Sequence, residues 1–258
     1  MTASVVEAKQ TFSRAQVPPL LEVARAWPGQ DVRHIIERLG LSSATIIQFA
    51  VCSGEPSKVE EFTAKIAQAR DVIARESIEE RVILLLAAPF DAPIVIRDVP
   101  QGIRAAYSRR FLAQDIREAY QNAQNALRFA LPSPQDRGPY MFTSGTWVNA
   151  DVMGGFEVLC LLSRDQINIV PDVHAIDTLV EKHGEQILRV LEAYAATESL
   201  RKAGTIVHMH HNTVAYWVQR AESVLGYPLN GPYRRTRLFV ALCLYRVRSS
   251  LTGLPLTS

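Results

Sequence analysis

Two short helices joined by a tight turn constrain this chain more than any other feature. Apolar residues at helical spacing predict one helix over Leu200–Val207 and another over His211–Leu225, with the turn at His208–Met209. Ser199 can cap the first helix, and Gly226 ends the second. Two helices connected this closely, with polar side chains at the start of the second, fit the template of a helix-turn-helix motif.

Small and apolar residues stand where the two helices should cross. Gly204 is small enough for the closest approach, although glycine lowers helix propensity. The other residues expected to pack are Ala203, Val207, Met209, Val214, Val218, Ala221 and Leu225. Further helices over Gly184–Ala196 and Tyr233–Arg248 flank the pair, so an all-α module is predicted at this end of the chain.

The positive charge of the chain is concentrated in the same region. From Ser199 onward there are eight basic residues and one acid, Glu222, giving +7; the whole chain has a net charge of +2, which leaves −5 for the preceding residues. The eight are Arg201, Lys202, Arg220, Arg234, Arg235, Arg237, Arg246 and Arg248. A basic end on an acidic body is typical of nucleic-acid binding, because cations that neutralise phosphates release condensed counterions. The alternative is a basic, solvated surface without a partner.

Polar side chains at the start of the helix over His211–Leu225 favour double-stranded DNA as the partner. A recognition helix presents its N-terminal side chains to base edges and phosphates in the major groove. Asparagine pairs with adenine edges, and threonine or histidine contacts bases or phosphates. The predicted DNA-binding residues are Lys202, His210, His211, Asn212, Thr213, Tyr216, Arg220, Arg234 and Arg235.

The run HMHHNTVAYWVQRAESVLGYPL resembles the C-terminal domain of PucR/CdaR-type transcriptional regulators, whose recognition segment has an H-R-N-T-V-x-Y-R-L core. The matching positions are His210, Asn212, Thr213, Val214, Tyr216, Arg220, Glu222, Leu225, Gly226 and Leu229. The resemblance covers about seventy residues. It implies a bacterial-type regulator that binds specific DNA sequences through the helix beginning near His211.

Three positions depart from the family pattern. Where relatives usually have basic residues in the recognition helix, this chain has His211, Ala215 and Trp217. The basic residues that remain for phosphate contacts are Arg201, Lys202, Arg234, Arg235 and Arg237. The departures leave a second function open, a metabolite-binding or protein-interaction module that keeps the helix-turn-helix shape with weak or no DNA binding.

Upstream of this module the sequence predicts a mixed α/β domain, so the expected fold class is α+β. The expected strands are Ala44–Cys52, Arg81–Ala88, Ala92–Ile96 and Tyr140–Val148. The expected helices are Leu20–Ala26, Asp31–Leu39, Lys58–Glu76, Ile103–Ala130 and Phe156–Leu162, with a loop over Leu131–Pro139. We expect a helical lead over 1–43, an α/β regulatory or dimerisation domain over 44–175, and the DNA-binding domain over 180–250.

The family resemblance implies that the middle domain is a degenerate, GGDEF-like (cyclase-like) domain. Arg109–Ala130 resembles the family's Y-x-x-A-x-x-A-L helix, and Asp151–Leu162 resembles its D-L-G-x-x-x-L-L stretch. The GGFE run at Gly154–Glu157 is not a cyclase signature, because no paired carboxylates accompany it to hold two metal ions. We therefore predict that the protein is not an enzyme.

No cofactor and no metal site are predicted. The histidines at 208, 210 and 211 lack an evident further ligand. The cysteines are odd in number and far apart, which predicts buried thiols in a reducing cytoplasm: Cys52, Cys160 and Cys243. Apolar runs are too short for a membrane span. The other partners expected are a second copy, in a homodimer, and a small-molecule effector of unknown identity.

Overall fold

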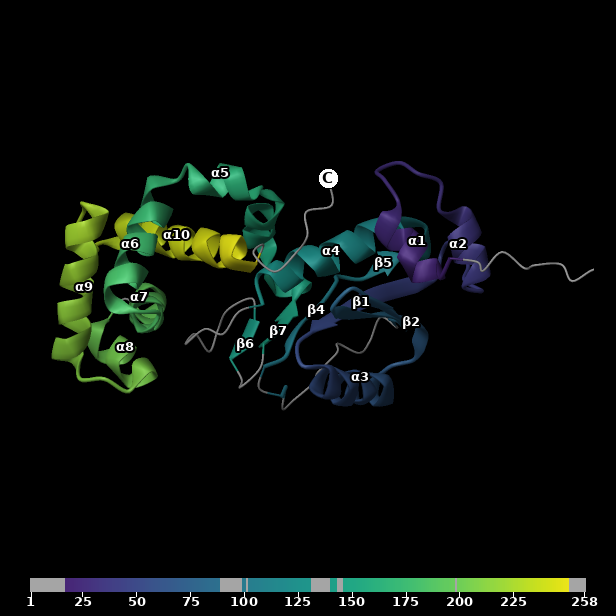
Figure 1. The fold of residues 1–258 in the computed structure, drawn as a ribbon, viewed down its shortest axis with the longest axis horizontal. Coiled ribbons are helices and arrows are strands. Elements are labelled where there is room, and N and C mark those ends of the chain that lie inside the picture. Colours follow the sequence, from purple (N-terminus) through teal and green to yellow (C-terminus); the bar gives the residue numbers. More distant parts are fainter. Residues whose placement is uncertain are drawn as a thin grey trace, which may run out of the picture.

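The computed structural model describes residues 17–88, 99–100, 102–130, 140–142, 146–197 and 199–250. Within these residues, a mixed α/β part lies at one end of the molecule and an all-helical part at the other (Figure 1). The α+β fold class expected from the sequence is therefore confirmed.

The α/β part holds the sheet and its covering helices. The strands are β1 (Ile46–Ser53), β2 (Val72–Ile78), β3 (Arg81–Ala87), β4 (Arg104–Tyr107), β5 (Phe111–Leu112), β6 (Tyr140–Phe142) and β7 (Thr146–Asn149). The α-helices are α1 (Pro19–Arg25), α2 (Arg33–Arg38), α3 (Pro56–Ala69) and α4 (Ile116–Arg128). The 3₁₀ helices are η1 (Ala113–Asp115), η2 (Ala150–Val152) and η3 (Gly154–Leu161).

The sheet has the order β2-β3-β1-β4-β7-β6, and β5 pairs with β1 beside β4. The β4–β7 pair is parallel, and the other pairs are antiparallel. Alternate residues of β1 enter different cores: Phe49 and Val51 pack with α1 and α4, whereas Ala50 and Cys52 pack with α3. Figure 1 shows α4 and α3 on opposite sides of the sheet. A strand buried on both faces explains the nearly unbroken apolar run at this position.

The helical part consists of α5 (Arg164–Asn168), α6 (Pro171–His183), α7 (Gln186–Thr197), α8 (Leu200–Val207), α9 (His211–Leu225) and α10 (Pro232–Ser250). The last four helices match the predicted ones to within two residues at each end. No helix is predicted from the sequence over α6, yet Ile176 and Leu179 of α6 lie in the same core as α7 to α10. Across the described ranges, no helix has both the length and the apolar character needed to cross a bilayer.

Helix α10 belongs to both parts of the molecule. Leu238 and Leu242 lie in the core of the helical part, whereas Leu244 and Val247 lie in the core formed by α4 and the sheet. In Figure 1, α10 runs from beside α6 toward α4. A single continuous helix thus joins the two cores.

Arginines of α10 pair with acids of α6 and α7. The pairs are Arg237 with Asp172, Arg246 with Glu192, and Arg248 with Asp177. Only the middle pair is buried on both sides, with 6% and 10% of the two side chains exposed and 2.6 Å between Arg246 Nη2 and Glu192 Oε1. A buried pair of this kind holds its two helices in one register, because neither charge can be left without its partner.

Two predicted helices are wrong over part of their length. The helix predicted over 58–76 ends at Ala69, and Val72 and Ile73 belong to strand β2. The helix predicted over 103–130, and its counterpart from Arg109 in the family resemblance, begins only at Ile116, because β4 and β5 precede it. Helix-forming residues in β4 pair between β1 and β7, so sheet pairing overrides local propensity.

Smaller corrections concern the segments that follow and the first helices. The strand predicted over 140–148 is two antiparallel strands, β6 and β7, and the helix predicted over 156–162 is the 3₁₀ helix η3. The N-cap of α2 is Val32, and Asp31 Oδ1 accepts the N–H of Arg33 at 3.0 Å. Gly40, which follows α2, has a left-handed backbone, with φ +69. The predicted strand Ala92–Ile96 and loop Leu131–Pro139 lie outside the described residues.

The cysteines are buried and free, as predicted. Burial raises the pKa of Cys160 and of Cys243 to about 12, and it raises the pKa of Cys52 as well. A thiol with a pKa of about 12 is ionised to roughly one part in ten thousand at pH 8, and the thiolate is the reactive form.

We therefore expect no alkylation of the folded protein by iodoacetamide at pH 8 within minutes. Mass spectrometry should find no added label in buffer and three labels per chain after denaturation in urea, since the chain has three cysteines. Rapid labelling of any one cysteine in buffer would contradict the burial of these thiols.

Candidate nucleic-acid interface

The turn between α8 and α9 closes tightly over Gly204. Helix α8 begins at Ser199, whose Oγ accepts the N–H of Lys202 at 3.4 Å, as predicted for a cap. It ends with His208 in the left-handed region, at φ 56 and ψ 42, and Met209 donates its N–H to the Gly204 carbonyl at 2.8 Å. This is a Schellman ending with histidine where glycine is usual.

A side chain at position 204 has no room. A Cβ built on Gly204 would lie 2.5 Å from the carbonyl oxygen of Met209 and 3.5 Å from the backbone nitrogen of His211. The close approach predicted for this glycine is confirmed, but its nearest neighbour is the backbone of the turn rather than the body of α9.

We expect Gly204→Ala to lower the free energy of unfolding by about 1–2 kcal/mol. Overpacking against a fixed backbone costs about 1–3 kcal/mol, and the better helix propensity of alanine offsets about 1 kcal/mol of that at most. Urea unfolding followed by circular dichroism measures the change. Gly155→Ala is the control, because a Cβ on Gly155 meets nothing within 4 Å. Equal stability of the Gly204→Ala variant and the wild type would show that the backbone of the turn shifts to accommodate the Cβ at no cost in free energy.

The first turn of α9 is capped by a histidine. His210 is the N-cap, and its Nδ1 accepts the N–H of Asn212 at 3.3 Å, which requires a neutral ring with its proton on Nε2. The rings of His210 and His211 lie 4.1 Å apart between centroids. The first turn has no acidic residue, so no local carboxylate neutralises the positive end of the helix dipole.

Helix α9 buries one side and exposes a polar face. Val214, Val218 and Ala221 are buried, as predicted. Among the predicted DNA-binding residues, His211 and Arg235 are half-buried, and the others are exposed: Lys202, His210, Asn212, Thr213, Tyr216, Arg220 and Arg234. Figure 1 places α9 at the end of the molecule away from the sheet. The structure therefore leaves the polar face of α9 accessible.

An aromatic side chain orients the arginine on this face. The guanidinium carbon of Arg220 lies 5.1 Å from the centre of the Tyr216 ring. Tyr216 is 47% exposed, whereas Trp217 is half-buried and meets His183 edge to face at 5.2 Å. Stacking on Tyr216 restricts the orientation of the guanidinium before any ligand binds.

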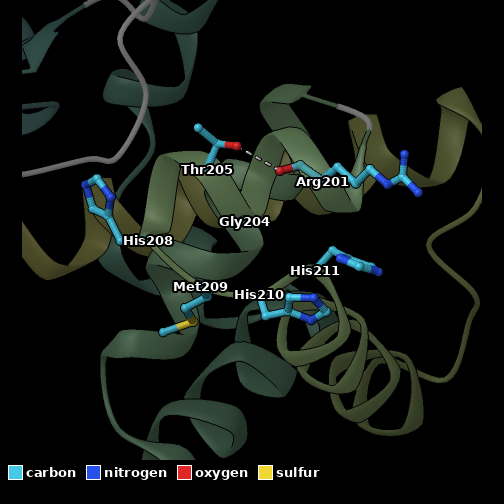
Figure 2. A pocket seen from close by; sticks show the side chains of 7 residues that line it. All are labelled: Arg201, Gly204, Thr205, His208, Met209, His210 and His211. Carbon is cyan, nitrogen blue, oxygen red and sulfur yellow. Dashed lines mark hydrogen bonds between the residues drawn. The ribbon is translucent and has the colours of Figure 1, made fainter.

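A hollow of about 380 Å³ opens at the turn between α8 and α9. Its lining residues are Arg201, Gly204, Thr205, His208, Met209, His210 and His211. Figure 2 shows the His210 and His211 rings side by side at the start of α9, with Arg201 extending from α8 above His211. None of the described residues that line the hollow is acidic. Its chemistry therefore suits an anionic group such as a phosphate.

Arg234 and Arg235 lie at the opposite end of α9 from this hollow. Glu222 Oε1 accepts the N–H of Leu229 at 2.6 Å and so ties the following loop, and with it the start of α10, to the last turn of α9. Because α9 has fifteen residues, about 22 Å separates its two ends. Cationic side chains thus stand near both ends of the polar face.

The positive charge counted from the sequence is partly cancelled in the fold. Arg237, expected among the phosphate contacts, instead donates two hydrogen bonds to Asp172, at 2.7 and 2.8 Å, and stacks 4.1 Å from the Tyr227 ring centre. The hydrogen-bonded Asp172 carboxylate raises the pKa of Arg237 above its usual value. The arginines at 246 and 248 are also paired. Of the other cations after Ser199, Arg201, Lys202, Arg220 and Arg234 are exposed, and Arg235 is half-buried.

The DNA-binding residues predicted from the sequence do not include Gln219, which also lies on the exposed polar face of α9. Gln219 is exposed and follows Tyr216 by three residues and Asn212 by seven. That spacing places the three side chains along one side of a helix. The helical period was a sufficient signal to include it.

Comparison with known proteins agrees with this geometry for the helical part. The family model of the PucR C-terminal helix-turn-helix domain matches residues 187–244, which span α7 to most of α10. Residues 187–244 are therefore a PucR-type helix-turn-helix domain. The comparison with curated proteins found no match.

One similar solved structure is described as "Crystal Structure of Regulator of Polyketide Synthase Expression from Bifidobacterium adolescentis". The identity is 13%, the alignment covers 89% of this chain and 91% of that chain, and the TM-score is 0.33. A TM-score this low establishes no common fold over that length.

Proposed function

We propose that this chain, with a PucR-type helix-turn-helix domain at residues 187–244, is a transcriptional regulator that binds double-stranded DNA. Helix α9 enters the major groove and presents Asn212, Thr213 and Tyr216 to base edges. The observation that carries this proposal is the exposed polar face of α9, with cationic side chains near both of its ends and no acid in its first turn.

Phosphates flanking the groove provide the sequence-independent part of the binding energy. One phosphate sits in the hollow between α8 and α9, near Arg201 and the imidazoles of His210 and His211, while Lys202 meets a neighbouring phosphate. Arg234 and Arg235 meet the backbone beyond the other end of α9. This division leaves the exposed side chains from Asn212 to Tyr216, which lie between the two sets of phosphate contacts, for the bases.

A salt series tests this division. The logarithm of the DNA association constant falls with the logarithm of salt concentration at a slope of about 0.9 per neutralised phosphate. The double variant Arg201→Ala/Lys202→Ala should therefore lower the magnitude of this slope by about 2. The matched control is Lys58→Ala/Lys65→Ala, which removes the same charge from α3. An unchanged slope, or no DNA binding by the wild type at low salt, would contradict the proposal.

The alternative of a module without DNA binding is less well supported. It rests on three positions of the recognition helix where relatives have basic residues and this chain has His211, Ala215 and Trp217. Ala215 and Trp217 are half-buried, and Trp217 packs against His183, so these two positions lie beside the exposed face and not at its centre. The exposed cations Arg201, Lys202, Arg220 and Arg234 support an anionic partner.

We further propose that residues 44–175 act as a GGDEF-like regulatory or dimerisation domain in a cytoplasmic homodimer, with residues 1–43 as a helical lead and 180–250 as the DNA-binding domain. The element order β1-α3-β2-β3, with β1 between β3 and β4, follows a split βαβ pattern and is compatible with such a domain. A small-molecule effector would act through this domain, and no catalytic role is proposed for it.

A further inference from the structure

Exposed apolar side chains are concentrated in one short segment. Nine large hydrophobic side chains are exposed in the part of the chain that the structure describes. Four of them fall between residues 152 and 169, namely Val152, Val158, Leu161 and Ile169, which are 56%, 62%, 65% and 79% exposed. Scattered single residues need no explanation, but a cluster of this kind marks an interaction surface.

The 3₁₀ geometry of η3 aligns two of these side chains into a ridge. With three residues per turn, positions 155, 158 and 161 lie on one side of the helix, so Val158 and Leu161 are neighbours about 6 Å apart along the axis. Gly155 precedes them on the same side with open space around it. We call Val158 and Leu161 the η3 ridge.

The opposite side of η3 is fixed to the body of the protein. Phe156 meets Phe239 of α10 edge to face at 5.5 Å between ring centroids, and Cys160 is fully buried. Arg128 of α4 donates hydrogen bonds to the carbonyls of Cys160 and Leu162. The η3 ridge is therefore held on a rigid support that leaves both of its side chains exposed.

Charge around the ridge favours a second copy of the same chain. The one acid within η3, Glu157, is turned away from the ridge, since it pairs with Arg109 at 3.2 Å and with Asn122. Beyond the ridge, Arg164 and Asp165 are adjacent, opposite in sign and both exposed. In a two-fold contact, each arginine can face the partner's aspartate, so the surface is complementary to itself.

We propose that the η3 ridge is the centre of a two-fold dimer interface, where the ridges of two copies pack against each other and the charges at 164 and 165 form the rim. This inference rests on the proposed function, because a reader of two half-sites needs two α9 helices related by symmetry. Apolar centres with polar rims are the usual composition of homodimer interfaces.

Replacing the ridge by acids should separate the dimer. In Val158→Asp/Leu161→Asp, two like charges from each copy face each other, and we expect the dimer dissociation constant to rise by about 100-fold or more. Sedimentation velocity over a concentration series measures it. Leu112→Asp is the control, because Leu112 is an exposed apolar residue on β5, outside the η3 ridge, with 40% of its surface accessible. Circular dichroism in urea verifies that the variants fold.

A cross-linking experiment locates the contact without changing the charge. Leu161→Cys and Val158→Cys introduce one accessible thiol each, while the three native thiols are buried. Under mild oxidation, at least one variant should give a disulfide-linked dimer on a non-reducing gel, since residues near a two-fold axis approach within about 7 Å between Cα atoms. Leu112→Cys should stay monomeric on the gel.

The outcomes separate this inference from the proposed function. A wild-type protein that is monomeric throughout the concentration series, or a folded double-aspartate variant that is as dimeric as the wild type, overturns the η3 interface. If the dimer depends on the ridge but the wild type binds no DNA, the interface stands and the proposed function fails.

Discussion

Replacing Glu192 by methionine while Arg246 remains is expected to lower the free energy of unfolding by about 3–5 kcal/mol. The two side chains are at least nine-tenths buried, with 2.6 Å between them. Loss of the carboxylate therefore removes the ion pair of a guanidinium that is only 6% exposed. The double variant Glu192→Met/Arg246→Met should recover most of the loss, because methionine fills a similar volume without a charge.

Urea unfolding of the four proteins, wild type, two single variants and the double variant, measures this coupling. The control pair is Glu55 and Lys58 on the surface, where Glu55→Met should change stability by less than about 1 kcal/mol. A single Glu192→Met variant within 1 kcal/mol of the wild type would mean that water or another group satisfies Arg246 once its partner is gone.

Replacing Asn212 by alanine is expected to weaken specific DNA binding by about 10- to 100-fold. Asn212 is exposed in the first turn of α9, and its side-chain amide makes no hydrogen bond to the described residues, so both of its polar groups are available to an adenine edge. One good bidentate contact contributes about 1–3 kcal/mol of discrimination. Binding to non-specific DNA should change little, because that binding depends on phosphates.

Fluorescence anisotropy at a fixed salt concentration measures both affinities, with a site selected from random DNA by the wild-type protein and a scrambled duplex. Ser223→Ala is the control, because Ser223 is exposed on the same helix about 16 Å further along. Equal losses for the selected and scrambled duplexes would assign Asn212 to the backbone, and no loss on either would remove it from the interface.

The helical part could be predicted well because its signals are local. Ser199 caps α8, Gly226 ends α9 with φ +77, and the apolar stripe of α9 follows the helical period. Helix α6 escaped prediction although its Pro171 is a typical first helical residue. Its three buried apolar residues, Val173, Ile176 and Leu179, pack against helices that lie far along the chain.

The α/β part was harder because non-local pairing decides it. The sequence RAAY of β4 consists of good helix formers apart from its tyrosine, yet Ala105 and Ala106 pair with β1 and β7 at the middle of the sheet. The run Val72–Ile73 continues the helical spacing of α3, and only the antiparallel pairing with β3 makes it a strand.

At the candidate site, the residue types were predictable and the charge balance was not. Composition identifies Arg237, Arg246 and Arg248 as cations of the C-terminal region, but their acidic partners come from α6 and α7. Such pairs require knowing which helices pack together. The exposed residues of α9 followed from the period of a single helix.

The shared helix α10 has a mechanical consequence. It has nineteen residues and is therefore about 28 Å long, with one end packed against α4 and η3 and the other against α6 and α7. In a rigid helix of that length, a tilt of roughly 10° about the end beside α4 would displace the far end by about 5 Å. That displacement exceeds the spacing of successive base pairs along B-DNA, about 3.4 Å, so under the proposed function a slight rearrangement beside α4 would be enough to shift α9 relative to a bound duplex.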